Sequence, residues 1–309
     1  MTQLGEAVGV AFIKDAAEKC PFQTPAPPSV TEEDEDAAKD DTHAVDDVQE
    51  NDGGKLGRNV VAGSSGSGGT WNALGAEPPV YKYPREDTRR IGVKARVKAD
   101  DKDYPFTVAA HHCIPGEASL HPSALFEKFM KKGGKMELNT STGTKTYDLQ
   151  EHIGYNVNGS HNGVWLPGSY AIRVSTSPVA GKSWGDLGDS GSEGAWRVSY
   201  MAAVVRAANG QFHDAHTHYN QQVLGMLNKL ALAVISHIVA CEECQKKTKM
   251  PPPYVLKERL YRLSRSLRLQ VKAGPRRWKL TLMTSDQVRT DVLGNPVRWK
   301  EFLDHYDGK

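Results

Sequence analysis

The chain lacks the features of disulfide-stabilised and membrane-spanning proteins. It has four cysteines among 309 residues, too few for a disulfide framework in a chain of this length. Such cysteine usage is typical of a protein made in a reducing cytosol. No apolar run approaches the ~18 residues that a transmembrane helix needs, so we expect no membrane span. The N-terminal apolar run contains acids and has no basic leader, so we expect no Sec signal peptide.

Charge is unevenly distributed along the chain. Residues 1–54 contain 14 acidic residues and three lysines, whereas the rest contains 36 basic and 23 acidic residues. A body this basic indicates a polyanionic partner such as nucleic acid. The acidic segment is either a solvated tail or a cover for the basic surface, and a tail is the more common case.

Composition divides the chain into three parts. Residues 21–70 are rich in proline, then in acids, then in glycine and serine, and cannot bury enough apolar surface to fold, so we expect a disordered linker. Together with a possible short helix over 4–19, we interpret residues 1–75 as a loading or adaptor-binding region. We expect the folded domain over 76–245. Residues 246–309, with 16 basic and 6 acidic residues, are interpreted as a basic C-terminal extension.

The hydrophobic pattern of the central part is typical of an α+β protein. Alternation predicts a hairpin that ends at Ala110, and "NGVWLP" predicts a short buried segment at 162–167. We expect irregular structure over 135–160 and a loop over 174–195. Helices are predicted over 121–132 (stopped by Gly133-Gly134), 196–209 and 213–240.

Histidines form two clusters that could carry chemistry. His111 and His112 stand at the predicted strand end, where neighbouring side chains point to opposite faces. If the segment from Phe212 onward is helical, His213 and His216 share a face. His111, His213 and His216 could then offer three nitrogens to a metal, leaving His112 as a base. Taken alone, each cluster is more often an ordinary strand end or a solvated helix start.

Three sequence blocks carry a family resemblance. They are "AHHCIPG" (110–116), "IGYNVNGSHNGVWLPGSYAIR" (153–173) and "FHDAHTHYNQQV" (212–223). In this order they resemble the HNH, or ββα-metal (His-Me finger), nuclease superfamily. The most similar branch is the bacterial toxin family named for its Ala-His-His (AHH) motif. The resemblance covers about residues 105–235 and implies a ββα-metal core with added helices.

The resemblance also implies roles for individual residues. It assigns His112 as the general base, His111 as a metal ligand, and Asn162 as the residue that braces the loop and hydrogen-bonds the base. It implies that at least one of His213 and His216 ligates metal. His218 is either an alternative ligand or a substrate contact. Asp214 and Tyr219 are expected to orient the ligands.

The implied function is a metal-dependent, largely non-specific endonuclease that prefers DNA over RNA. It would use one divalent ion, Mg²⁺ or Zn²⁺, with Ni²⁺ also compatible. The family implies an antibacterial toxin delivered into a target cell by a contact-dependent route such as type VI secretion. It also implies an immunity protein and an adaptor or chaperone at the N-terminus. Two alternatives stay open: a non-catalytic DNA-binding protein with a structural zinc, and an intracellular phage or defence HNH enzyme.

Two further segments contain functional residue types. "CEEC" (241–244) follows His237 and has the spacing of a zinc site, but it lacks a second pair, so we interpret it as two ordinary thiols. An amphipathic basic stretch could clamp nucleic-acid backbone, be a solvated face, or dock a partner. The residues assigned to nucleic-acid contact are Arg262, Arg265, Arg268 and Lys272.

Overall fold

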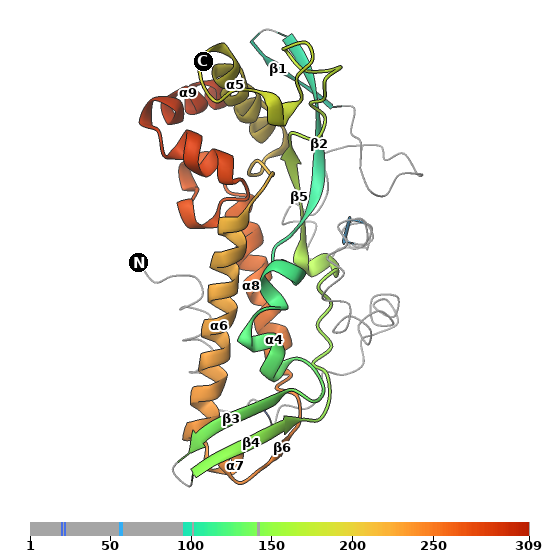
Figure 1. Cartoon of the computed structure of the whole chain (residues 1–309), viewed down its shortest axis with the longest axis vertical. Coiled ribbons are helices and arrows are strands. Elements are labelled where there is room, and N and C mark those ends of the chain that lie inside the picture. Colours follow the sequence, from blue (N-terminus) through green and yellow to red (C-terminus); the bar gives the residue numbers. More distant parts are fainter. Residues whose placement is uncertain are drawn as a thin grey trace. The chain divides into compact units, whose positions relative to one another are not determined.

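A computed structural model describes Cys20, Phe22, Leu56, Gly57 and residues 95–100, 102–140 and 143–308. The predictions of a short helix over 4–19 and of disorder over 21–70 fall almost entirely outside these residues. The described part mixes helices and small sheets, which confirms the α+β class (Figure 1). The chain divides into two units. Unit 1 comprises 1–52, 112–162 and 220–266, and unit 2 comprises 53–111, 163–219 and 267–309.

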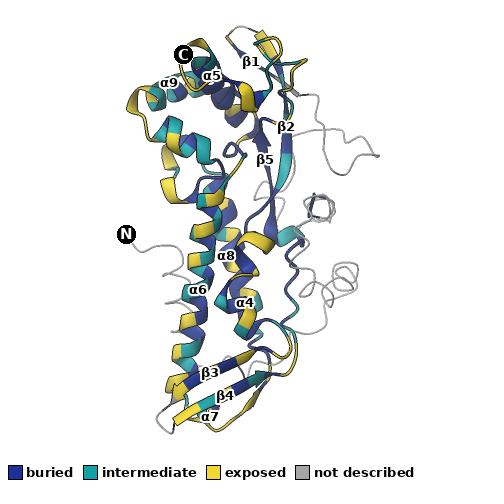
Figure 2. Cartoon of the chain, in the orientation of Figure 1, coloured by how far each residue is buried: buried dark blue, intermediate teal, exposed yellow. Residues whose placement is uncertain are grey.

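Unit 2 is built on a three-stranded sheet of order β1-β2-β5, from β1 (Ala95–Ala99), β2 (Lys102–His112) and β5 (Gly163–Gly168). The predicted hairpin is confirmed, because β1 and β2 pair antiparallel with Ala95 opposite Phe106. The turn between them places Asp100 in the left-handed region, at φ +48°. The strand β2 continues two residues beyond the predicted end at Ala110, so it ends on the histidine pair. All of β5 is buried, as expected from "NGVWLP" (Figure 2).

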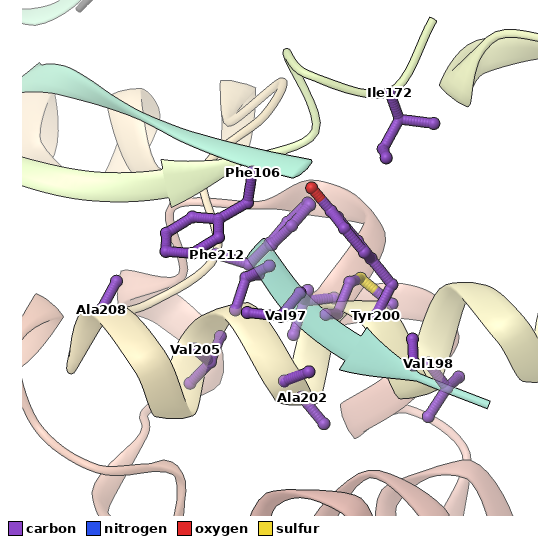
Figure 3. Packing of buried hydrophobic residues seen from close by; sticks show 14 of the residues in the cluster. Val97, Phe106, Ile172, Val198, Tyr200, Ala202, Val205, Ala208 and Phe212 are labelled. Atoms are coloured by element: carbon purple, nitrogen blue, oxygen red, sulfur yellow. The ribbon is translucent and has the colours of Figure 1, made fainter. Parts of the chain in front are cut away.

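The helix α5 (Gly191–Ala208) covers the core of unit 2. Figure 3 shows Phe106 and Phe212 gathered with Tyr200 and Val205 of α5. The Tyr200 hydroxyl donates to the Pro105 carbonyl at 3.0 Å, so this buried phenol is satisfied. The helix begins five residues before the predicted Trp196 and ends at Asn209, whose φ of +50° breaks it.

The C-terminal part of unit 2 is helical and contributes to the same core. It contains three short helical turns (Pro275–Arg277, Leu280–Leu282, Val288–Leu293) and α9 (Pro296–Asp307). Met283, which follows the second of these turns, belongs to the core of unit 2 together with Val288, Val292 and Phe302. The segment expected to be a separate basic extension therefore packs as part of the fold, and its residues are divided between the two units.

Unit 1 contains α4 (Ala124–Phe129) and a second sheet of order β3-β4-β6, from β3 (Lys135–Thr140), β4 (Gly143–Leu149) and β6 (Lys249–Met250). The Ser123 hydroxyl caps α4 by accepting from Phe126 N at 3.2 Å. The expectation of irregular structure was wrong for 135–149, where an antiparallel hairpin forms. Only Met136, Leu138, Tyr147 and Leu149 are buried along it, so its apolar alternation is too sparse to stand out in the sequence.

Unit 1 also contains most of α6 (Thr217–Ala240) and α8 (Val255–Val271), and all of α7 (Glu242–Gln245). Contrary to the expectation from apolar runs, α6 is long and apolar enough to span a membrane. The core helix of a soluble protein satisfies the same criteria. The residues Val223, Leu227, Leu230, Val234 and Ile238 follow a helical period and are buried, which is the pattern of a packed face.

Lys272, assigned above to nucleic-acid contact, is half-buried in unit 2. Its ammonium group donates to the Ala208 carbonyl at the end of α5, at 3.1 Å. Burial lowers the pKa of Lys272 to about 8. The side chain therefore supports the end of α5, while burial of its positive charge destabilises the folded state.

We expect Lys272→Met to stabilise the protein near neutral pH. A depressed lysine pKa means that the cost of the buried charge is fully present below about pH 8 and disappears as the pH rises toward the ordinary lysine value. The variant removes this cost but also loses the hydrogen bond to Ala208. The net gain in the free energy of unfolding at pH 7 is on the order of 1 kcal/mol. Urea unfolding at pH 7 to 10 measures this. The exposed Lys279→Met is the control and should show no such pH trend. A destabilisation independent of pH would contradict the interpretation.

Candidate metal centre

His111, His213 and His216 meet in unit 2. Their ring centroids form a nearly equilateral triangle of 5.0, 5.1 and 5.0 Å. One nitrogen from each ring lies within 4.8 Å of the others, so the three could hold one ion. His111 and His213 are buried and His216 is half-buried. The group is the set of three residues proposed from the sequence.

The ends of β2 and β5 position two of these rings. His111 is the penultimate residue of β2. Gly168, the last residue of β5, forms a parallel bridge with His213, whose N–H donates to the Pro167 carbonyl at 2.7 Å. A Cβ atom on Gly168 would lie 2.6 Å from the His213 carbonyl oxygen, so this close approach requires glycine.

His213 and His216 do not share a helix face, which corrects the sequence prediction. The helix α6 begins at Thr217, after both of them. The side chain of Asp286 accepts hydrogen bonds from the N–H groups of Thr217 at 2.8 Å and of His218 at 3.3 Å. The Asp286 N–H in turn donates to the Ala215 carbonyl at 2.7 Å. A carboxylate is favourable at a helix N-terminus, so Asp286 fixes where α6 begins.

The Nδ1 atoms of two ligand candidates are already engaged. His213 Nδ1 lies 2.7 Å from the Tyr170 hydroxyl, and His216 Nδ1 lies 2.8 Å from the Asp214 carbonyl oxygen. A carbonyl only accepts, so His216 carries its hydrogen on Nδ1 and presents Nε2 as the basic nitrogen. Hydrogen bonds of this kind orient metal-binding histidines in proteins.

Tyr170 supports His213 through its hydroxyl group. The residue as a whole is 44% exposed, but its oxygen lies against the buried His213 ring. Burial, and then the charge of Asp214, raise the pKa of Tyr170 to about 12. The phenol is therefore neutral at physiological pH and can accept from an Nδ1–H group.

Asp214 and Tyr219, the expected orienting residues, both lie next to the histidines. Tyr219 packs edge-on against His111, with ring centroids 5.0 Å apart. Asp214 acts on His216 through its backbone carbonyl, while its carboxylate accepts from Ser285 Oγ at 2.9 Å. Burial raises the pKa of Asp214 to about 7, against the opposing effect of the Ser285 hydrogen bond.

His218, the alternative ligand, does not join the group of three among the described residues. Its N–H is part of the Asp286 cap, and it is the second residue of α6. Because His218 lies on α6, its side chain is not part of the group that His213 and His216 form before the helix.

His112, the proposed base, belongs to unit 1. Its side chain is buried, and its Nε2 lies 2.8 Å from Asn158 Oδ1. Because Oδ1 only accepts, this bond places the hydrogen on Nε2 and the basic lone pair on Nδ1. Asn158 was not singled out in the sequence, although it stands in the same block as Asn162.

Asn162 is fully buried and braces the chain after the histidine pair. Its Oδ1 accepts from Ile114 N, and its Nδ2 donates to the carbonyls of Ile114 and Val157, each at 2.8 Å. Ser264 Oγ donates to the same Oδ1 at 3.1 Å. These contacts agree with the loop-bracing role, whereas the bond to His112 comes from Asn158.

The proposed nucleic-acid contacts differ in exposure. Arg262 and Arg265 are exposed on α8, and Arg262 pairs with Glu258 one helical turn earlier. Arg268 is fully buried, so the prediction that it contacts a nucleic-acid backbone does not fit its place in the core. Lys272 donates to Ala208 within unit 2.

A second group of four potential metal ligands includes the "CEEC" pair, which we interpreted from the sequence as two ordinary thiols. It joins Cys20 and His237 to Cys241 and Cys244 within unit 1. The pattern "CEEC" lacked a second pair, and the fold supplies the partners from distant positions. The His-x₃-Cys spacing before Cys244 was the local signal, and Cys20 had none.

Comparisons with known proteins give no match: no protein-family model, no curated protein and no solved structure is similar to this chain. The chemistry of the site therefore depends on the residues themselves. Three neutral imidazole nitrogens suit Zn²⁺ or Ni²⁺. Mg²⁺ takes mostly oxygen ligands, so the donor set fits it less well.

We expect Tyr170→Phe to weaken metal binding without removing a ligand. The variant loses the hydrogen bond to His213 Nδ1, and loss of such a partner typically lowers metal affinity about 10- to 100-fold. Titration calorimetry with Zn²⁺ measures the change. The matched control is Tyr306→Phe on α9, which belongs to neither group. An unchanged affinity in Tyr170→Phe would show that the phenol does not support the ligand.

Proposed function

We propose that the chain is a metal-dependent endonuclease that hydrolyses phosphodiester bonds of DNA. The observation that carries this proposal is the convergence of three imidazole rings, with a fourth histidine next to His111 in the chain. His111, His213 and His216 would hold the ion, and His112 would act as the base. The division of roles follows from the strand, where adjacent side chains point to opposite faces.

The number of ligands favours a catalytic centre. Catalytic zinc sites commonly use three protein ligands, whereas structural sites use four. A divalent ion bound there would supply Lewis-acid stabilisation of negative charge on the phosphate oxygens. The nitrogen donors favour Zn²⁺, with Ni²⁺ or Mg²⁺ as the ions to compare in the assay.

His112 would take the proton from the attacking water. The hydrogen bond from Nε2 to Asn158 fixes the tautomer, so Nδ1 is the atom that receives the proton. Imidazole is the side chain whose ordinary titration lies nearest neutral pH, which suits this transfer. Asn162 would act as a positioning residue, since it holds the backbone of Ile114 just after the base.

The substrate follows from charge and from the family resemblance. The chain beyond residue 54 carries 36 basic and 23 acidic residues, which favours a polyanion bound through its phosphates. In the proposed ββα-metal centre, β2 and β5 would supply the two strands and α6 the helix, with further elements inserted between them in the chain. The resemblance to AHH toxins favours non-specific cleavage of DNA over RNA.

The biological setting we propose is that of a delivered antibacterial toxin. It would be made in the bacterial cytoplasm, act in the cytoplasm of the target cell, and be neutralised in the producer by an immunity protein. An adaptor or chaperone would bind residues 1–75. If the neighbouring genes encode a small acidic protein, this setting is favoured. If they encode phage or defence proteins, an enzyme acting in its own cell is favoured.

We expect His112→Ala to abolish DNA cleavage while metal binding persists. Loss of a general base typically lowers the rate about 100- to 10,000-fold. The measurement is plasmid cleavage by the purified protein with Mg²⁺, Zn²⁺ or Ni²⁺, together with chromosomal DNA integrity in an expressing host. His305→Ala on α9 is the control histidine and should cleave like the native chain.

The outcomes separate the alternatives. If the native chain binds DNA and zinc but never cleaves, the non-catalytic DNA-binding alternative replaces the nuclease. If His112→Ala cleaves as fast as the native chain, the base assignment is wrong even though the nuclease stands. Zinc calorimetry on each variant shows whether a loss of cleavage reflects a loss of the centre.

We expect Arg262→Gln combined with Arg265→Gln to weaken DNA binding and its salt dependence. Each lost phosphate contact lowers the slope of log Kobs against log[salt] by about 0.9, so the pair changes it by at most about 2. Fluorescence anisotropy at several salt concentrations measures the slope. The control is the other exposed pair, Arg276→Gln with Arg277→Gln. Equal effects in both variants would mean that α8 makes no dedicated contact.

A further inference from the structure

Four potential metal ligands, three cysteines and one histidine, converge at the end of α6 in unit 1. Ligand atoms of Cys20, His237, Cys241 and Cys244 all lie within 4.8 Å of one another. The sulfur atoms of Cys20 and Cys244 are 3.4 Å apart. Cys244 is buried and the other three are half-buried. None of these residues takes part in the three-histidine centre described above.

The corner between α6 and α7 supplies three of the four ligands. The Cys241 N–H donates to the His237 carbonyl at 2.9 Å, and the Gln245 N–H donates to the Cys241 carbonyl at 3.0 Å. His237 lies in the last turn of α6, Cys241 is the residue with extended backbone that precedes α7, and Cys244 lies on α7, so the break between the two helices gathers these side chains. Cys20, more than two hundred residues earlier, supplies the fourth ligand.

The arrangement differs from that of a disulfide. A disulfide requires sulfur atoms about 2.05 Å apart and would join only two of the three thiols. All three cysteines are free. Sulfur atoms bound to zinc at about 2.3 Å in a tetrahedron lie about 3.8 Å apart, close to the separation of Cys20 and Cys244.

The histidine provides an independent observation. His237 Nε2 is buried and makes no hydrogen bond within the described part of the chain. A buried polar atom without a partner is costly, and metal coordination is one of the few ways to satisfy it. A ring nitrogen of His237 lies within 4.8 Å of each of the three sulfur atoms.

We propose that Cys20, His237, Cys241 and Cys244 form a structural zinc site of the Cys₃His type. Thiolate ligands favour Zn²⁺ strongly, and a set of four leaves no position for substrate. The site ties Cys20 to the corner between α6 and α7. It is separate from the proposed nuclease centre and stands whether or not the chain cleaves DNA.

The test measures zinc per chain in the full-length protein. His213→Ala removes one ligand of the three-histidine centre, so in that background we expect one zinc equivalent to remain. Adding Cys241→Ser or Cys20→Ser should remove it, as counted by plasma mass spectrometry. Cys113→Ala, which changes the remaining cysteine of the chain, is the matched control and should keep the zinc. Circular dichroism verifies that each variant is folded.

Cobalt substitution identifies the ligand atoms without relying on activity. We expect a sulfur-to-cobalt charge-transfer band in the His213→Ala chain and in its Cys113→Ala derivative, and its loss with Cys241→Ser. His237→Cys should retain the ion, because a fourth thiolate is an equally good ligand, whereas His237→Ala should weaken it. The proposal is overturned if the His213→Ala chain holds no zinc, if Cys241→Ser holds as much, or if Cys20 and Cys244 are found oxidised to a disulfide.

Discussion

The hydrogen bonds of Asp286 hold the proposed metal centre together. Its carboxylate accepts from the first two N–H groups of α6, and its own N–H donates to Ala215. Thr284 and Ser285 reinforce the same stretch through Phe212 and Asp214. The segment from His213 to His216 lies before the helix start, with a bend at Asp214, and both rings lie next to His111.

The two metal-ligand groups differ in the way a catalytic and a structural site differ. The histidine group has three nitrogen donors, one near the end of β2 and two in the segment before α6, where the Gly168 bridge holds His213 and the Asp214 carbonyl holds the His216 ring. The cysteine group has four donors, three of them from the corner where α6 ends and α7 begins. An open set suits an ion that must also touch substrate, and a closed set suits an ion that only ties segments together.

Local patterns predicted the parts of the site that are local. The β1–β2 hairpin and the buried β5 follow from alternation and from "NGVWLP", and the three ligand histidines were named from their clusters. The helical face proposed for His213 and His216 was wrong, since the capping residue lies some seventy positions downstream. Cys20 and Tyr170 were missed for the same reason. Their partners, Cys244 and His213, lie far away in the sequence, and local sequence patterns do not predict such contacts.

The position of Asp286 has a consequence for the order of events during synthesis. The ligand histidines leave the ribosome well before the residue that caps α6. A nascent chain that does not yet include Asp286 therefore carries the three imidazoles without the residue that caps α6, and the centre can be completed only after Asp286 has emerged. For a protein proposed to be harmful to nucleic acid, this order would keep such shorter nascent chains inert.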